Sequence, residues 1–240
     1  MLKGVFFDFG DTLLPWSATL LKVHRTFTWP TFRQFQKNLT FQQLVTAIDR
    51  ADQRFTRFWS QHVEVYKFWL ELAQELGISS FTKTKAEDFN RAIWQRHLRV
   101  VRLYPGVLPT LRWLRGIHVK LAIVSNAWNY ILNMYLDRLA LRPLFQFVVT
   151  SEDAGAMKSE LVPFQLALAH LDLAPEAVLH IGDRLDEDGA CRRLGIRFAW
   201  LTLPGTKAAA LQAGGNEQAY DFRDSSYSAV RKTIRRLLSA

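Results

Sequence analysis

The 240-residue chain has little cysteine and no long hydrophobic run. Its one cysteine, Cys191, excludes an intrachain disulfide, and cysteines and histidines nowhere have the spacing of a structural zinc site. No apolar run approaches the ~18 residues that a membrane-spanning helix needs. The apolar run at residues 5–7 is too short for a signal peptide. We therefore expect a cytoplasmic protein with no membrane partner.

Charged residues are also modest in number, at 22% of the chain, whereas 49% of the residues are hydrophobic. This composition excludes a disordered or collagen-like chain. Lys and Arg total 31 against 22 Asp and Glu, so the net charge is +9. Such a charge permits the binding of anions but does not indicate a fold or a reaction. The length fits one large core or a core with an inserted unit.

Acidic residues are absent from positions 89–136. The same stretch carries seven of the basic residues: Arg91, Arg96, Arg99, Arg102, Arg112, Arg115 and Lys120. A positive rim that attracts a phosphorylated substrate and a nucleic-acid surface both fit this pattern. A solvated basic face is the more frequent meaning of such a run. Because no nucleic-acid-binding motif accompanies it, nucleic acid is not expected as a partner.

Short β-rich runs alternate with helical patterns in the second half of the chain, which is typical of parallel strands joined by crossover helices. With one run near the N-terminus, five strand candidates are buried on both faces: 4–7, 118–124, 145–149, 177–181 and 198–201. Gly214-Gly215-Asn216 predicts a loop, and Ser225-Ser226 is expected to cap a last helix. The sequence thus predicts an α/β fold.

About a hundred residues separate the first two strand candidates, and their apolar side chains repeat at helical spacing. Two sets carry this pattern: Phe41, Leu44, Val45 and Ile48, and Phe68, Leu72 and Leu76. Pro15 closes the first loop, and Tyr104-Pro105-Gly106 opens the return to the sheet. We therefore expect a helical cap at 15–100, inserted into a core made of 1–14 and 101–240.

Polar residues follow four of the strand candidates, at the ends where an open α/β sheet binds its ligands. In chain order they are Asp8, Gly10, Asp11 and Thr12, then Ser125 and Asn126, then Lys158, and then Asp183, Asp186, Glu187 and Asp188. Together they would supply a carboxylate nucleophile, a hydroxyl and an amide, a fixed cation and an acidic cluster suited to a hard divalent metal.

This set resembles the four motifs of the haloacid dehalogenase superfamily of aspartate-nucleophile hydrolases, most of which are phosphatases. The residues that resemble the motifs, in the family's order, are Asp8 with Thr12, Ser125-Asn126, Lys158, and Asp183 with Asp188. The resemblance covers most of the chain. It implies a Rossmann-like parallel sheet core with an α-helical cap domain inserted after the first strand.

The resemblance also implies a Mg²⁺-dependent phosphatase for small phosphorylated metabolites. Asp8 would attack phosphorus and form an aspartyl phosphate. The residues expected to hold Mg²⁺ are Asp8, Gly10 through its backbone carbonyl, Asp183 and Asp188. Lys158 would pair with Asp8 and the phosphate, while Ser125 and Asn126 with their backbone amides would hold another phosphate oxygen. Whether the protein is a monomer or a homodimer is left open.

The first motif departs from the family at Gly10, where related phosphatases usually carry a second aspartate that protonates the leaving group. Asp11 follows one residue later, but such a shift re-aims a side chain in an extended segment, so its compensation for Gly10 stays open. General acid–base help is typically worth about 10²–10⁴-fold. Its loss predicts a slow phosphatase, a restriction to good leaving groups, or other chemistry.

Three further residues are candidates for supporting roles. Asp186 and Glu187 could share the role of Asp188, although acids are also favoured at a helix start. Trp16 stands just after the first motif, where a hinge between core and cap is expected, and could line the pocket.

Other functions remain open at this stage. A haloacid dehalogenase also lacks the second aspartate but uses no metal, so Asp183 and Asp188 favour phosphoryl transfer. A phosphonate hydrolase needs an imine-forming cap lysine, and nothing distinguishes Lys22, Lys37 or Lys67. Gly10 also permits a homologue that binds a ligand without turnover.

Overall fold

Six parallel strands form a single sheet in the computed structural model, which describes residues 1–58, 60–204, 206 and 220–239. The strands are β1 (Gly4–Phe7), β2 (Lys120–Ser125), β3 (Phe147–Thr150), β4 (Val178–Gly182), β5 (Arg197–Leu201) and β6 (Phe222–Asp224). Their order across the sheet is β3-β2-β1-β4-β5-β6. The α/β fold is therefore confirmed, and the five predicted runs coincide with β1 to β5 within two residues at either end.

The expectation of five strands was wrong by one. β6 has three residues, of which only Asp224 is buried, so it carries no apolar run that could mark it as a strand. It forms by pairing with β5 at the edge of the sheet. The loop predicted at Gly214-Gly215-Asn216 lies outside the described residues.

β1 lies inside the sheet, with strands on both sides of it. β2 and β3 follow on one side, and β4, β5 and β6 follow on the other. Phe7 pairs with Ile123 of β2 on one side and with Ile181 of β4 on the other. The next backbone amide, that of Asp8, still donates to the Ile181 carbonyl at 2.9 Å. The loops that follow β1, β2 and β4 therefore meet at one edge, which is where an open parallel sheet binds ligands.

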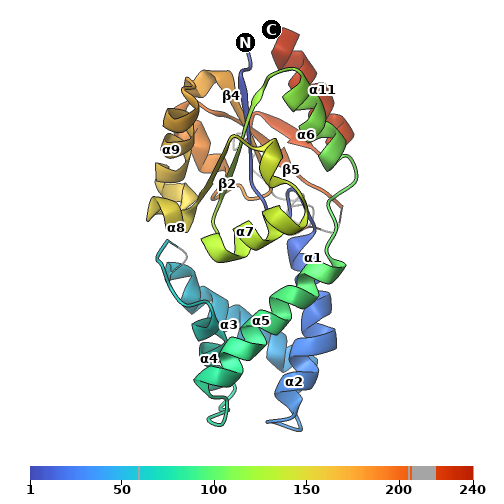
Figure 1. Ribbon diagram of the computed structural model, residues 1–240, viewed down its shortest axis with the longest axis vertical. Coiled ribbons are helices and arrows are strands. Elements are labelled where there is room, and N and C mark those ends of the chain that lie inside the picture. The colour runs from blue at the N-terminus through green and yellow to red at the C-terminus, as the bar shows by residue number, and fades with distance from the viewer. Residues whose placement is uncertain (59, 205, 207–219, 240) are drawn as a thin grey trace.

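Helices cover both faces of the sheet because successive strand side chains point to opposite faces. Val5 and Phe7 belong to the hydrophobic cluster that includes side chains of α6, α7 and α11, whereas Phe6 packs with those of α9. These core helices, with the short α8, are α6 (Val107–Gly116), α7 (Asn129–Arg138), α8 (Ser151–Ala154), α9 (Val162–Leu171) and α11 (Tyr227–Ser239). Figure 1 shows α9 on one side of the sheet and α6 and α11 on the other.

The last helix follows its prediction. Ser226 accepts a hydrogen bond from the Ala229 amide at 3.1 Å, as an N-cap residue does. Val230, Ile234 and Leu237 are buried against the sheet on one face of α11.

The chain between β1 and α6 is helical. Its helices are α1 (Trp16–Val23), α2 (Trp29–Arg33), α3 (Phe41–Phe55), α4 (Tyr66–Glu75) and α5 (Lys83–Val100), with a π-helical turn at His24–Thr28. The predicted periodicities fall on α3 and α4, and a capping box between Thr40 and Gln43 begins α3. In Figure 1 these helices form the half of the molecule away from the two termini, beyond the carboxyl end of β1. The inserted α-helical unit is thus confirmed.

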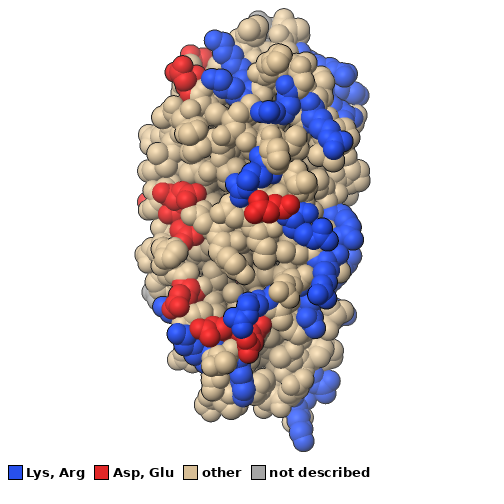
Figure 2. All heavy atoms as spheres, in the orientation of Figure 1, with Lys and Arg blue, Asp and Glu red and all other residues tan. Residues whose placement is uncertain are grey.

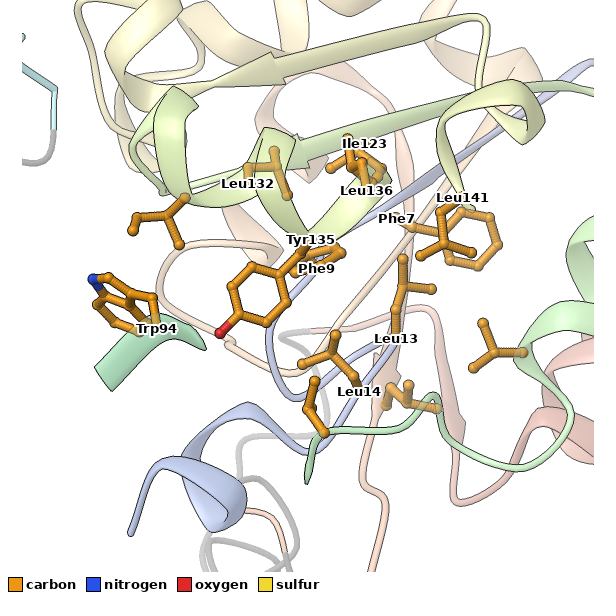
Figure 3. Packing of buried hydrophobic residues seen from close by; sticks show 14 of the residues in the cluster. Phe7, Phe9, Leu13, Leu14, Trp94, Ile123, Leu132, Tyr135, Leu136 and Leu141 are labelled. Carbon is orange, nitrogen blue, oxygen red and sulfur yellow. The ribbon is translucent and has the colours of Figure 1, made fainter. Parts of the chain in front are cut away.

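The inserted helices contact the core through side chains of α3 and α5. The ring of Phe55 lies edge-on to that of Trp128, with centroids 5.7 Å apart. His97 of α5 bonds to the hydroxyl of Tyr135 on α7. Figure 3 shows Trp94 beside Tyr135 and Phe9 at this junction. The two parts of the molecule therefore share one continuous hydrophobic cluster.

Charge is unevenly distributed over the surface. Figure 2 shows Lys and Arg concentrated along the side where α6 and α11 lie. Of the seven basic residues in the acid-free stretch, all except the half-buried Lys120 are exposed to solvent. This agrees with a solvated basic face. Among the described residues, no helix is both long and apolar enough to cross a membrane.

Candidate active site

Asp8 lies at the carboxyl end of β1 and is the centre of a buried polar cluster. Its Oδ1 accepts hydrogen bonds from Lys158 Nζ at 2.7 Å and from Ser125 Oγ at 3.2 Å. Its Oδ2 accepts a longer bond from Thr12 Oγ1, at 3.4 Å. All four side chains are buried. The structure thus brings these four predicted residues together at one edge of the sheet.

Lys158 and Asp188 form the second part of the cluster. Lys158 Nζ also donates to Asp188 Oδ1, and Asp188 Oδ2 accepts from the Arg184 backbone amide at 2.9 Å. His180 Nε2 lies 2.9 Å from Asp188 Oδ1, while its Nδ1 has no hydrogen-bond partner among the described residues. A carboxylate can only accept, so a neutral His180 carries its proton on Nε2.

Asp183 completes a group of three carboxylates. Oxygen atoms of Asp8, Asp183 and Asp188 all lie within 4.8 Å of one another. Lys158 pairs with Asp8 and Asp188 in the structure, so three acidic side chains lie around this one lysine. Hard oxygen ligands at this separation are the donors that Mg²⁺ prefers, and the group fits a divalent cation.

The electrostatics of the cluster follow from burial and from the closeness of these acidic groups. Burial raises the pKa of Asp183 to about 9, and the charges of Asp8 and Asp188 add to the effect. Burial likewise raises the pKa of Asp8 although Lys158 opposes it. For Asp188, burial is outweighed by the Lys158 charge and the His180 hydrogen bond, which lower its pKa. Lys158 stays protonated because both carboxylates raise its pKa against the effect of burial.

Glycine is required at position 182 for this arrangement. A Cβ built on Gly182 would overlap the side chain of Asp188. The last residue of β4 therefore has no side chain so that the carboxylate of Asp188 can fold back over the strand end and reach Lys158.

Asp11 is bound to the start of α1. It has a left-handed backbone, with φ 55°, and its Oδ1 accepts from the Ser17 amide at 3.0 Å. Its Oδ2 accepts from the Ser17 hydroxyl. Asp11 thus binds the first turn of α1, where an acidic group is favoured by the helix dipole.

The remaining predicted residues occupy supporting places. Asn126 Oδ1 accepts from the Lys158 amide at 2.9 Å, and Glu187 Oε2 accepts from the Ser159 amide at 3.1 Å, so both hold the backbone around Lys158. Asp186 is exposed and pairs with Arg184 outside the carboxylate group. Trp16 lies against Gly10, as its place in the sequence suggested.

His180 is the residue of the cluster that sequence reasoning missed. It lies on β4, is fully buried, and contacts Phe164 and Phe198 with its ring. The available signal was a polar residue within an apolar strand, two positions before Gly182. Its partner Asp188 lies eight residues away in the chain, and no periodicity connects the two.

Comparison with known proteins agrees with this geometry. A family model described as haloacid dehalogenase-like hydrolase matches residues 5–201, which include every residue of the cluster. The chain belongs to the haloacid dehalogenase-like hydrolase family. The resemblance to this family noted from the sequence is therefore confirmed.

Curated relatives of this haloacid dehalogenase-like chain include phosphatases. It is 24% identical over 191 residues to a glyceraldehyde 3-phosphate phosphatase of Methanocaldococcus jannaschii, covering 78% of this chain and 79% of the relative. It is 28% identical over 195 residues to a ribulose-1,5-bisphosphate 5-phosphatase of Halopiger xanaduensis, covering 78% and 79% respectively.

Solved structures of the same family share the fold along almost the whole chain. A 2-haloacid dehalogenase of Pseudomonas syringae superposes with a TM-score of 0.71 at 21% identity, covering 99% of this chain and 100% of the other. A phosphatase of Thermococcus onnurineus gives 0.68 at 21% identity, with 97% and 98% covered. Because both reaction types occur on this fold, the choice between them depends on the site.

Proposed function

We propose that this protein is a Mg²⁺-dependent phosphatase that hydrolyses small phosphate monoesters through an aspartyl phosphate on Asp8. The observation that carries the proposal is the group of three carboxylates around Lys158, with Asp8 bonded to both Lys158 and Ser125. A buried carboxylate beside a fixed cation is a nucleophile that can meet a phosphate without prohibitive repulsion.

The first chemical step belongs to Asp8. A carboxylate oxygen of Asp8 attacks phosphorus, a P–O bond forms to the carboxylate, and the bond to the leaving oxygen breaks. The leaving oxygen takes the electron pair of that bond and acquires a proton from solvent water. Lys158 and Ser125, which contact the attacking carboxylate in the structure, would turn to the phosphoryl oxygens and offset their charge.

The second step is hydrolysis of the aspartyl phosphate. Water adds at phosphorus, the carboxylate of Asp8 leaves, and inorganic phosphate is released. Asp8, Asp183 and Asp188, with the Gly10 carbonyl, would hold Mg²⁺, which when bound supplies positive charge against the phosphate. Asn126 and Glu187 act on the backbone around Lys158 and so keep its ammonium group in place.

Gly10 limits the leaving groups that this site can accept. Position 10 has no side chain, and the neighbouring Asp11 is bound to the start of α1. With no carboxyl group at this place, the leaving group must depart without an aspartic acid to protonate it. We therefore propose substrates with weakly basic leaving groups. The helices at 15–100 would act as a cap that selects a small phosphorylated metabolite. We propose that the protein acts in the cytoplasm.

The donor set favours phosphate over carbon–halogen chemistry. Three carboxylates within 4.8 Å are suited to a divalent cation, which a dehalogenase mechanism does not need. The named activities of the curated relatives support the same choice. Phosphonate cleavage would require a lysine of the inserted helices at the site. The only lysine that the structure bonds to Asp8 is Lys158 of the core, among the residues described.

The test is hydrolysis of a panel of phosphate monoesters, measured with Mg²⁺ and with EDTA. Wild-type protein is expected to hydrolyse an activated aryl phosphate in the presence of Mg²⁺ but not in EDTA. Asp8→Asn is expected to reduce this activity by at least about 10³-fold. Asp172→Asn is the matched control, since Asp172 is exposed, lies before β4 at the other end of the sheet, and has a left-handed φ that asparagine tolerates.

Each alternative has its own outcome. Halide release from a 2-haloacid that persists in EDTA would assign the protein to the dehalogenases. Borohydride trapping of an imine on a lysine would assign it to phosphonate cleavage. Binding of phosphate or vanadate without turnover of any ester would make it a binding homologue.

A further inference from the structure

The indole of Trp16 borders the loop that carries the nucleophile. A Cβ placed on Gly10 would lie 3.4 Å from Trp16 Cβ, 3.5 Å from Cγ and 3.9 Å from Cδ2. Gly10 also forms an isolated β-bridge with Leu14. The side chain of Trp16 therefore stands beside Gly10, which lies two residues after Asp8 in the chain.

Trp16 is held in this position from two directions. Its ring centroid lies 5.6 Å from that of Trp94 and 4.9 Å from that of His97, both on α5. On the core side it lies 5.0 Å from the ring of Tyr135 on α7. His97 Nε2 also lies 3.3 Å from the Trp16 carbonyl. The indole is thus fixed by packing and does not move freely over the site.

Trp16 is nevertheless only half-buried, whereas Tyr135 and His97, which pack behind it, are buried. Trp16 is thus partly open to solvent, and so is the neighbouring Gly10. A rigid aromatic side chain of this kind provides a flat apolar surface, and aromatic partners prefer to stack on such a surface. The opposite part of the site is polar, with Lys158, Ser125 and the carboxylates around Asp8.

From this arrangement we infer that Trp16 is a specificity-determining residue, whose indole stacks on the leaving group and selects phosphate monoesters with a planar aromatic leaving group. The inference rests on the proposed function, because it assigns the leaving group of the same reaction. The polar part of the site receives the phosphate, and the indole beside Gly10 receives the flat group attached to it.

The experiment compares two esters whose leaving groups have matched pKa but different shape: phenyl phosphate, and an alkyl phosphate whose alcohol is made equally acidic by fluorination. Wild-type protein should have the higher kcat/KM with phenyl phosphate. Trp16→Ala should reduce this aryl-to-alkyl ratio by about three- to ten-fold, mainly through KM, as expected for loss of one aromatic stacking contact. Trp16→Phe, which keeps a flat ring, should retain most of the ratio.

Trp113→Ala is the control, because Trp113 lies on α6 beneath Arg235, away from Asp8. It should leave the ratio unchanged. An equal loss with both esters in Trp16→Ala, or a wild type without aryl preference, would overturn the inference and leave the phosphatase intact. Wild-type protein that hydrolyses neither ester, or hydrolysis that survives Asp8→Asn, would instead overturn the proposed function and this inference with it.

Discussion

Single residues decide whether the carboxylate cluster can form at all. Asp8, Lys158 and Asp188 are buried, and each carboxylate is positioned by donors from different parts of the chain. Breaking a buried charged contact costs far more than breaking a surface pair, because the remaining charge is left without a partner. Positions that only make room for these side chains are therefore as sensitive as the charged residues themselves.

Gly182→Ala is the sharpest test of this sensitivity. The added methyl group would overlap Asp188, which cannot move away without losing Lys158 and the Arg184 amide. We expect a loss of about 1–3 kcal/mol in the free energy of unfolding, together with a strong fall in kcat. Urea unfolding and ester hydrolysis measure the two effects. Gly116→Ala, at the end of α6 where no atom lies within 4 Å of the added methyl, should leave kcat unchanged and should not lower the free energy of unfolding.

His97 makes the stability of the protein depend on pH. Burial lowers its pKa from 6.5 to about 4. Below pH 6.5 His97 binds a proton in the unfolded chain but not in the folded chain. The free energy of unfolding is therefore highest above pH 6.5 and falls as the pH drops towards 4. Between pH 7 and pH 5 this one group should remove about 2 kcal/mol. His97→Gln should lose less stability than wild type over that interval in urea unfolding. An identical loss would show that His97 titrates normally.

At the scale of elements, the loop after β1 and the start of α1 are joined through Asp11. Both of its carboxylate oxygens accept bonds from Ser17, so this acid belongs to the helix start. The bonds to Ser17 support the proposal that Asp11, one residue after the position of the expected acid, does not replace it. They also tie the catalytic loop directly to the first inserted helix.

Asp11→Asn separates the two roles of this residue. Asparagine has nearly the same shape and tolerates the left-handed backbone at this position, but it cannot transfer a proton. We expect kcat/KM within a few-fold of wild type and an unchanged pH–rate profile. If Asp11 were the general acid and base, the rate would instead fall by about 10²–10⁴-fold and one limb of the profile would vanish.

At the scale of the whole molecule, the site lies where the sheet faces the inserted helices. The three carboxylates lie close together around Lys158, and burial together with the charges of Asp8 and Asp188 raises the pKa of Asp183, so the folded protein concentrates acidic groups that repel one another at the end of its sheet. Anything that offsets this repulsion only in the folded state stabilises the fold by mass action.

Magnesium should therefore raise the melting temperature. At a concentration 100-fold above its dissociation constant, it should add about 2.7 kcal/mol, or roughly 5–10 °C for a chain of this size. Thermal denaturation with MgCl₂, EDTA and NaCl at matched ionic strength measures this shift. Asp183→Asn should abolish most of it. A rise of equal size in NaCl would mean that general screening, and not a bound ion, stabilises the protein.

The sequence by itself determined the parallel sheet, the helical insertion and the residues that meet at the strand ends. It could do so because buried strands require apolar runs, helices require periodic ones, and strand ends of a parallel sheet lie together. β6 was not predicted, because its three residues become a strand only by pairing with β5.

Only the tertiary structure decided which polar side chains act together. His180 reaches Asp188 because Gly182 leaves room for that carboxylate, and Asp11 turns to Ser17 because its backbone is left-handed. Trp16 meets Gly10, Trp94 and Tyr135 from three separate elements. Contacts of this kind depend on side-chain direction and on packing between distant segments, and neither composition nor periodicity along the chain encodes them.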